Sequence, residues 1–176
     1  MSVAGSLTVE IKARCSDPAR IRAILRSHRA RFKGLDHQID TYFRIPFGRL
    51  KLREGKIENA LIYYNRTDQK SSKRCDSVLC QYPDSSSLKK ILAASLGILV
   101  VIDKKREIYF IRNVKFHIDR VKKLGSFMEI EVYGRAKNAA KLKKQCVFYQ
   151  KLLGIRAKDL VADSYSDLLL RLKTGD

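Results

Sequence analysis

Two carboxylates, Glu129 and Glu131, stand two positions apart in the segment GSFMEIEVY at residues 125–133. Apolar residues occupy the alternate positions, which predicts a strand with one apolar face and one face that carries both glutamates. Two neighbouring carboxylates repel each other unless water or a cation lies in front of them. The segment alone therefore fits a solvated outer face and a cation site equally well.

Cations alternate with aliphatic residues in the same way elsewhere. The segment RLKLR places Arg49, Lys51 and Arg53 on one side of a predicted strand and two leucines on the other. Near the N-terminus, Glu10 and Lys12 share a face opposite aliphatic residues. Neighbouring positive charges on one strand face repel each other and are destabilising unless nearby anions neutralise them. The alternative to an anion-binding face is a basic strand that is exposed to water.

The elements that must position these residues follow from periodicity. Strands are predicted over 7–14, 36–43, 49–53, 60–66, 76–82, 100–112, 114–119 and 125–133. Helices are predicted from Pro18 to about Arg31, over 86–96, over 136–153 and from Asp163 to Leu172. Several strands share one signature, with aliphatic residues on one face and ionic residues on the other.

This signature predicts an α+β fold, a closed eight-stranded antiparallel β-barrel with a polar lumen and a few surrounding helices. The apolar stripes of the helices must cover a surface, and the aliphatic strand faces supply it. Closing the sheet also removes exposed edges. The expected lumen lining contains the cations Lys12, Arg14, Arg49, Lys51, Arg53, Arg66, Lys104 and Arg106, and the carboxylates Glu10, Asp119, Glu129 and Glu131.

Such a lining has a specific chemical use. Clustered cations recognise an oligophosphate, and carboxylates in the same cavity hold Mg²⁺ or Mn²⁺, which bridge to phosphate oxygens. Acidic residues would weaken a nucleic-acid groove. The mixture therefore favours a metal–polyphosphate site.

Composition sets the wider expectations. The 176 residues are expected to form a single domain, 1–176, with a core at about 6–170. The net charge of +19 predicts a polyanionic partner, which leaves nucleic acid or another polyanion open beside a small phosphorylated substrate. The four cysteines lack metal-site spacing and are expected to be free thiols in a reducing compartment. No apolar run reaches membrane-spanning length. We expect a soluble, intracellular protein of the cytoplasm, with the nucleus also open, and a monomer or homodimer.

Six segments occur in a characteristic order along the chain: TVEIK at 8–12, HQIDTYF at 37–43, GRLKLRE at 48–54, KKREIY at 104–109, HID at 117–119 and LGSFMEIE at 124–131. Through these segments the chain resembles the CYTH superfamily of triphosphate tunnel metalloenzymes, most of all its class IV adenylyl cyclase-like branch, which is related to thiamine triphosphatases. The resemblance covers about residues 6–170. No single segment is specific, but their order is.

The resemblance implies an eight-stranded tunnel that binds triphosphates with Mg²⁺ or Mn²⁺. It implies metal ligands at Glu10, Asp119, Glu129 and Glu131, and catalytic roles for Glu10, Lys12, Glu129 and Glu131. The implied phosphate-binding residues are Lys12, Arg49, Lys51, Arg53, Arg66, Lys104 and Arg106, with Tyr42 and His117 lining the tunnel. Tyr165 belongs to a C-terminal segment that closes over the mouth in relatives.

One position departs from the family pattern. Thr8 stands where the first glutamate of the family's N-terminal ExExK motif is expected. The leading hypothesis is a metal-dependent phosphohydrolase acting on tripolyphosphate, thiamine triphosphate or a nucleoside triphosphate. An adenylyl cyclase that makes cyclic AMP and pyrophosphate is a second hypothesis. A non-catalytic protein that binds polyphosphate, nucleotides or an RNA 5′-triphosphate is a third, favoured by Thr8 and by the large positive charge.

Overall fold

The structure is a computed structural model that describes residues 6–66, 73–82 and 85–175. Within these ranges, the side chains of residues 6, 66, 73–77 and 85 are not described.

The described residues form an α+β fold. The strands are β1 (Ser6–Arg14), β2 (Arg31–Phe43), β3 (Arg49–Glu54), β4 (Ala60–Arg66), β5 (Lys73–Cys80), β6 (Ile98–Ile111), β7 (Val114–Val121) and β8 (Gly125–Arg135). The α-helices are α1 (Pro18–Ser27), α2 (Ser85–Leu96), α3 (Ala139–Leu152) and α4 (Tyr165–Thr174). Two short 3₁₀ turns, η1 (Ala136–Asn138) and η2 (Ala157–Asp159), flank α3.

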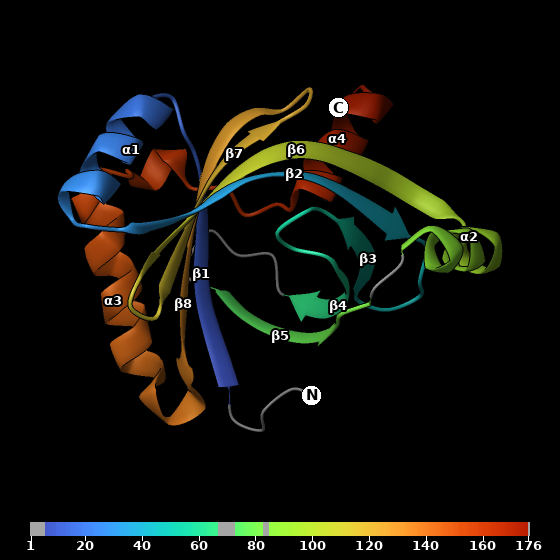
Figure 1. The fold of residues 1–176 in the computed structure, drawn as a ribbon, viewed down its shortest axis with the longest axis horizontal. Helices are drawn as coiled ribbons and strands as arrows, with labels where there is room; N and C mark the ends of the chain where they lie inside the picture. Colours follow the sequence, from blue (N-terminus) through green and yellow to red (C-terminus); the bar gives the residue numbers. More distant parts are fainter. Residues whose placement is uncertain (1–5, 67–72, 83–84, 176) are drawn as a thin grey trace.

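The strands curl into a half-barrel around a central space (Figure 1). Their hydrogen-bonded order is β1-β5-β4-β3-β2-β6-β7-β8, every neighbouring pair is antiparallel, and β8 pairs with β1. Within the described residues, the pairing of β1 with β5 covers two positions, Val9 with Arg74 and Glu10 with Lys73. Every other pair is joined over at least five positions. In the described part of the chain, the two sides of the half-barrel thus meet at a short contact between β1 and β5.

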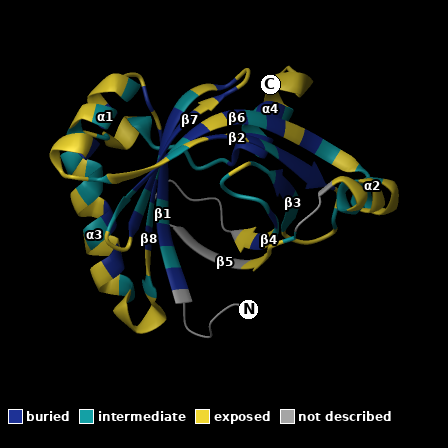
Figure 2. Ribbon diagram, viewed as in Figure 1, coloured by how far each residue is buried: buried dark blue, intermediate teal, exposed yellow. Residues whose placement is uncertain are grey.

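Helices α1 and α3 cover the outside of β1, β7 and β8, as the apolar strand faces require (Figure 1). Ile21 and Leu25 of α1, and Leu142 and Cys146 of α3, pack against aliphatic residues of these strands. In Figure 2 the outward sides of both helices are largely exposed, whereas the strands beneath them are largely buried. The aliphatic residues therefore face outward from the barrel, which directs the alternate, ionic residues inward.

The interior of the barrel is apolar next to α4 and polar elsewhere. A second apolar cluster, built around Phe127, Val100 and Ile102, fills the part next to α4. Tyr165 and Leu169 of α4 belong to this cluster, and the rings of Phe127 and Tyr165 meet edge to face. Ser164 caps α4 by accepting a hydrogen bond from the Asp167 backbone N–H, so the helix begins directly above the cluster. The polar part of the interior lies beyond it.

The first helix is shorter than its periodicity predicts. It ends at Ser27, not near Arg31, and Arg29 adopts a left-handed conformation with φ of +53°. Strand β2 then begins at Arg31, because the chain from there pairs with β6 as far as Phe110. Long-range strand pairing thus overrides a helical pattern that continued beyond the cap.

Two further expectations concern cysteines and membrane spans. Cys15, Cys80 and Cys146 are free thiols, which confirms that prediction for the described cysteine side chains, whereas the side chain of Cys75 lies outside them. In the described residues, no helix combines the length and the apolar character needed to cross a membrane.

Candidate functional site

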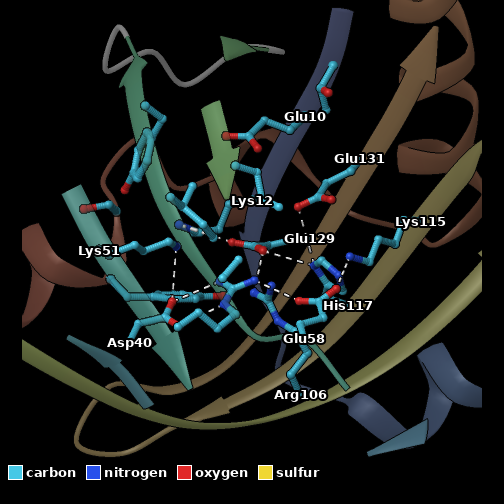
Figure 3. A pocket seen from close by; sticks show the side chains of 18 of the residues that line it. Glu10, Lys12, Asp40, Lys51, Glu58, Arg106, Lys115, His117, Glu129 and Glu131 are labelled. Carbon is cyan, nitrogen blue, oxygen red and sulfur yellow. Dashed lines mark hydrogen bonds and ion pairs between the residues drawn. The ribbon is translucent and has the colours of Figure 1, made fainter. Parts of the chain in front are cut away.

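A cavity of about 280 Å³ occupies the polar part of the barrel interior (Figure 3). Its lining comes from β1, β2, β3, β4, β6, β7 and β8, the loop before β4, Leu79 of β5, and the start of α4. The volume is close to the lower end of small-molecule sites in proteins. Charged side chains from opposite walls converge in it.

Asp40 of β2 is the first point of convergence. Arg53 donates to it through Nε and Nη2 at 2.8 and 3.0 Å, and Lys51 Nζ lies 3.1 Å from Oδ2. Lys104 Nζ lies 2.7 Å from the same oxygen. Burial alone would raise the pKa of Asp40, but the positive charges of Arg53, Lys104 and Lys51 hold it well below its usual value. Asp40 is therefore an ionised carboxylate that positions three cations.

Glu129 of β8 is the second point of convergence. Arg106 Nη2 donates to its Oε2 at 2.7 Å, and Lys12 Nζ lies 3.3 Å from its Oε1. Burial opposes ionisation of this group, but Arg106, Lys12 and His117 together hold its pKa well below the usual range. Lys12 also lies 4.1 Å from the centre of the Tyr165 ring, so β1 and α4 meet at this residue.

His117, Glu129 and Glu131 form a group that could hold a metal ion. One ligand atom from each lies within 4.8 Å of the others. His117 Nδ1 is 3.3 Å from Glu129 Oε2 and 3.7 Å from Glu131 Oε1. The pKa of Glu131 is lowered, because His117 and Lys115 outweigh burial and the neighbouring charge of Glu129. Both carboxylates are thus ionised, as metal binding requires.

The donor set fits a divalent cation. The Nε2 atom of His117 is buried and has no hydrogen-bond partner among the described residues. Nδ1, not Nε2, is the ring nitrogen that faces Glu129 and Glu131, so the fit rests on the donor chemistry of one imidazole nitrogen and two carboxylates. Two carboxylates with an imidazole suit Mn²⁺, whereas Mg²⁺ favours oxygen ligands. Glu10 points into the same cavity near Glu131 (Figure 3).

The charges of the described lining residues balance. The cations are Lys12, Lys51, Arg53, Arg106 and Lys115, and the carboxylates are Glu10, Asp40, Glu58, Glu129 and Glu131. The sequence predicted a lumen dominated by cations. The difference arises because Asp40 and Glu58 also enter the cavity, and because some of the predicted cations do not.

Most of the residues predicted for the site line this cavity. They are Glu10, Lys12, Tyr42, Lys51, Arg53, Arg106, His117, Glu129, Glu131 and Tyr165, and Thr8 joins them. Lys104 and Asp119 are buried behind the lining. Asp119 accepts hydrogen bonds from Arg106 Nε and from the Tyr165 hydroxyl, both at 2.7 Å, so its oxygens serve to hold these two residues.

Two predicted cations lie outside the lining, and the side chain of a third is not described. Arg49 pairs with Asp167 of α4 at 3.0 Å, outside the lining. Arg14 donates to the Leu124 carbonyl at 2.6 Å and lies over the Phe127 ring, also outside it. The side chain of Arg66 lies outside the described residues.

Sequence reasoning missed several lining residues, among them the charged or polar side chains of Asp40, Glu58, Tyr64 and Lys115. Asp40 shares a strand face with Tyr42, and Lys115 shares one with His117, so alternation could have found both. Tyr64 likewise lies on the face of β4 whose alternate residues line the cavity, so alternation could have found it too. Glu58 lies in a loop, where no periodicity points to a cavity.

Comparisons with known proteins agree with this geometry. The chain resembles the PH1012 protein of Pyrococcus horikoshii at 25% identity, with a TM-score of 0.76, over 92% of this chain and 98% of that one. A candidate adenylate cyclase of Vibrio parahaemolyticus shares the fold at 17% identity and a TM-score of 0.76, over 94% and 99% of the two chains. A candidate adenylyl cyclase of Hippeastrum, described with a dominant triphosphatase activity, shares it at 12% identity and 0.59, over 96% of each chain.

None of the curated proteins matches this sequence. The profile of the CYTH domain, in contrast, matches residues 6–165, which span the strands, the cavity and the first residue of α4. By this match the chain belongs to the CYTH domain family.

Proposed function

We propose that this chain is a metal-dependent phosphohydrolase that acts on a triphosphate-bearing substrate inside a closed eight-stranded tunnel formed by a single domain. The observation that carries the proposal is the pairing, in one cavity, of a His117–Glu129–Glu131 group with five cations held on surrounding strands. The triphosphatase activity described for the Hippeastrum protein, which shares this fold, supports the reaction class.

The balanced lining argues that the substrate enters with a cation. A free triphosphate carries several negative charges, and a lining whose charges cancel offers it no net attraction. A substrate that carries a divalent cation is less negative and matches the carboxylates as well as the cations. His117, Glu129 and Glu131 would hold the metal, which when bound supplies Lewis-acid polarisation of a phosphoryl oxygen.

The cations of the site would bind the phosphate chain. Lys51 and Arg53 come from one wall, and Lys12 and Arg106 from the other, so a chain between them would be contacted from both sides. Asp40 and Glu129 fix these groups before the substrate arrives, which reduces the cost of ordering them during reaction. Negative charge that grows on the leaving phosphate would be stabilised by the same donors.

Water activation would depend on placement more than on a strong base. The lowered pKa of Glu131 keeps this carboxylate ionised and makes it a weak proton acceptor. It can still accept a hydrogen bond from a water and orient it toward the terminal phosphorus. Phosphoryl transfer is catalysed largely by such positioning and by electrostatics.

The test is incubation with tripolyphosphate, thiamine triphosphate and ATP, each with Mg²⁺ and then Mn²⁺, while orthophosphate and cyclic AMP are measured. The expected result is orthophosphate that disappears in the Glu129→Ala/Glu131→Ala variant and persists in Glu107→Gln. Glu107 is a matched control because it pairs with Arg22 on the outer face. Cyclic AMP in place of orthophosphate would identify an adenylyl cyclase. Binding without any product would leave a non-catalytic triphosphate receptor.

A further inference from the structure

Glu58 is a cavity carboxylate that the phosphohydrolase mechanism does not use. It lies in the loop between β3 and β4 and lines the cavity, with its side chain 19% exposed (Figure 3). Its Oε2 accepts hydrogen bonds from Arg53 Nη1 at 2.8 Å and from Gln38 Nε2 at 3.1 Å, and its Oε1 accepts one from Lys115 Nζ. It therefore joins a cation of β3 to a cation of β7.

Hydrogen bonds to the side chain of Asp36 fix the loop that carries Glu58. The buried carboxylate of Asp36 accepts the backbone N–H groups of Lys56 and Ile57 on Oδ1, at 2.8 and 3.1 Å. Its Oδ2 accepts the N–H of Glu58 at 3.0 Å. A Cβ at Gly55 would lie 2.6 Å from Asp36 Oδ2, so only glycine permits this approach. The main chain at Glu58 is thus fixed by the fold before any ligand binds.

Glu58 accepts hydrogen bonds from groups of Arg53 and Lys115 that would otherwise be available to bind phosphate. Arg53 already gives Nε and Nη2 to Asp40, and Glu58 takes Nη1. Lys115 faces the cavity from β7, next to the His117 position, and its ammonium group is also bound to Glu58. A phosphate that reached for Lys115 would have to lie beside an ionised carboxylate, which repels it.

We propose that Glu58 limits the length of the phosphate chain that the cavity accepts. The phosphate chain lies between Lys51 and Arg53 on one side and Lys12 and Arg106 on the other. Glu58 occupies the position that a further phosphate would take next to Lys115. A triphosphate ends before this carboxylate, whereas a longer polyphosphate meets it. The proposal deepens the function proposed above and rests on it, since it assigns the selectivity of the same site.

The experiment compares tripolyphosphate with long-chain linear polyphosphate, each titrated by calorimetry in the presence of Mn²⁺. The variant is Glu58→Gln, which keeps the size of the side chain and its hydrogen bond to Arg53 but removes the charge. Glu54→Gln is the matched control, because Glu54 is a few residues away and pairs with Lys89 of α2 at 2.7 Å, outside the cavity.

The expected result is a change in the ratio of the two affinities. The native protein and Glu54→Gln should prefer tripolyphosphate. In Glu58→Gln the affinity for long-chain polyphosphate, relative to that for tripolyphosphate, should rise by about tenfold or more, as expected when one like charge is removed from a partly buried contact. If Glu58 has only a structural role, the substitution should lower the affinities for both ligands equally. The ratio of the two affinities would then be unchanged, which would overturn the proposal.

The same data separate this proposal from the one on which it depends. If the native protein binds tripolyphosphate but Glu58→Gln shows the native ratio, only the chain-length proposal fails. If the native protein binds neither ligand with Mn²⁺ or Mg²⁺, the triphosphate site itself is refuted, and the role of Glu58 with it.

Discussion

His117 and Glu129 lie directly opposite each other on β7 and β8, with Nδ1 of the imidazole 3.3 Å from Oε2 of the carboxylate. Glu131, two positions along β8, brings a second carboxylate to the same imidazole. This relationship depends on the register of two antiparallel strands, which places the three side chains on one face. It is the basis of the first prediction.

Removing one carboxylate from this group should abolish tight metal binding. Glu131→Gln keeps the shape of the side chain but loses the charge, and we expect the affinity for Mn²⁺ to fall by at least about tenfold. Titration of Mn²⁺ by calorimetry measures it, and Glu107→Gln on the outer face should behave like the native protein. An unchanged affinity in Glu131→Gln would show that Mn²⁺ binds elsewhere.

Adding a carboxylate at Thr8 should have the opposite effect. Thr8 lines the cavity and is paired with Tyr133 across β1 and β8, beside Glu131. In Thr8→Glu the extra negative charge should raise the affinity for Mn²⁺ by about tenfold and weaken the binding of metal-free tripolyphosphate. Thr8→Gln, which has nearly the same length and no charge, should reproduce neither effect. Equal behaviour of the two variants would mean that residue 8 does not reach the metal group.

The carboxylate of Asp40 should make a large, pH-dependent contribution to stability. Replacing it in Asp40→Asn leaves Lys104, Arg53 and Lys51 without their shared anion, and we expect a loss of about 3 kcal/mol or more in the free energy of unfolding at pH 7. Chemical denaturation measures the loss. Asp103→Asn, in a pair with His37 that is exposed to solvent, should change the stability little.

The sign of the pH dependence follows from the lowered pKa of Asp40. In the unfolded chain an aspartate takes up its proton near pH 4, whereas the folded Asp40 stays ionised to lower pH. The unfolded state then binds more protons, so the free energy of unfolding falls as the pH drops below about 4. The difference between Asp40→Asn and the native protein should shrink over that range. A constant difference from pH 7 to pH 3 would contradict the assignment.

The hydroxyl group of Tyr165 should stabilise the junction of α4 with the barrel. It donates to the buried Asp119 at 2.7 Å, and the pKa of Tyr165 is raised well above its usual value by burial and by the charge of Asp119. Tyr165→Phe should lower the free energy of unfolding by about 2 kcal/mol, the value of a buried hydrogen bond to a charged group. Because the ring remains under Lys12, affinity for tripolyphosphate should change less than in Tyr165→Leu, which removes the ring.

Two measurements check this prediction. Thermal or chemical denaturation gives the stability, and calorimetry with tripolyphosphate gives the affinity. Tyr149→Phe, whose ring packs on Phe116 outside the barrel, is the matched control and should alter neither quantity appreciably. If the Tyr165→Phe variant is as stable as the control, the hydrogen bond from Tyr165 to Asp119 does not stabilise the junction of α4 with the barrel.

Strand alternation alone predicts much of the cavity. It places Glu10, Lys12, Lys51, Arg53 and Glu129 on ionic faces, and all of them line the cavity. The period of two in a strand is a local property of the backbone, so it can be read along the chain. The same rule could not decide that Arg49 turns to Asp167 of α4, because that partner is distant in sequence.

Local pattern by itself determined the ionic and aliphatic faces of the strands, the family resemblance and the residues from which a metal and phosphate site could be built. Only the tertiary structure decided the balance of charge, because Glu58 reaches the cavity from a loop fixed on Asp36 and Arg49 turns away to Asp167 of α4. It also decided that Asp119 lies behind Arg106 and that α4 fills one part of the interior. These outcomes depend on which strands become neighbours when the sheet curls, and that is a property of the whole chain, since pairs such as Lys104–Asp40 and Arg106–Asp119 join residues of different strands.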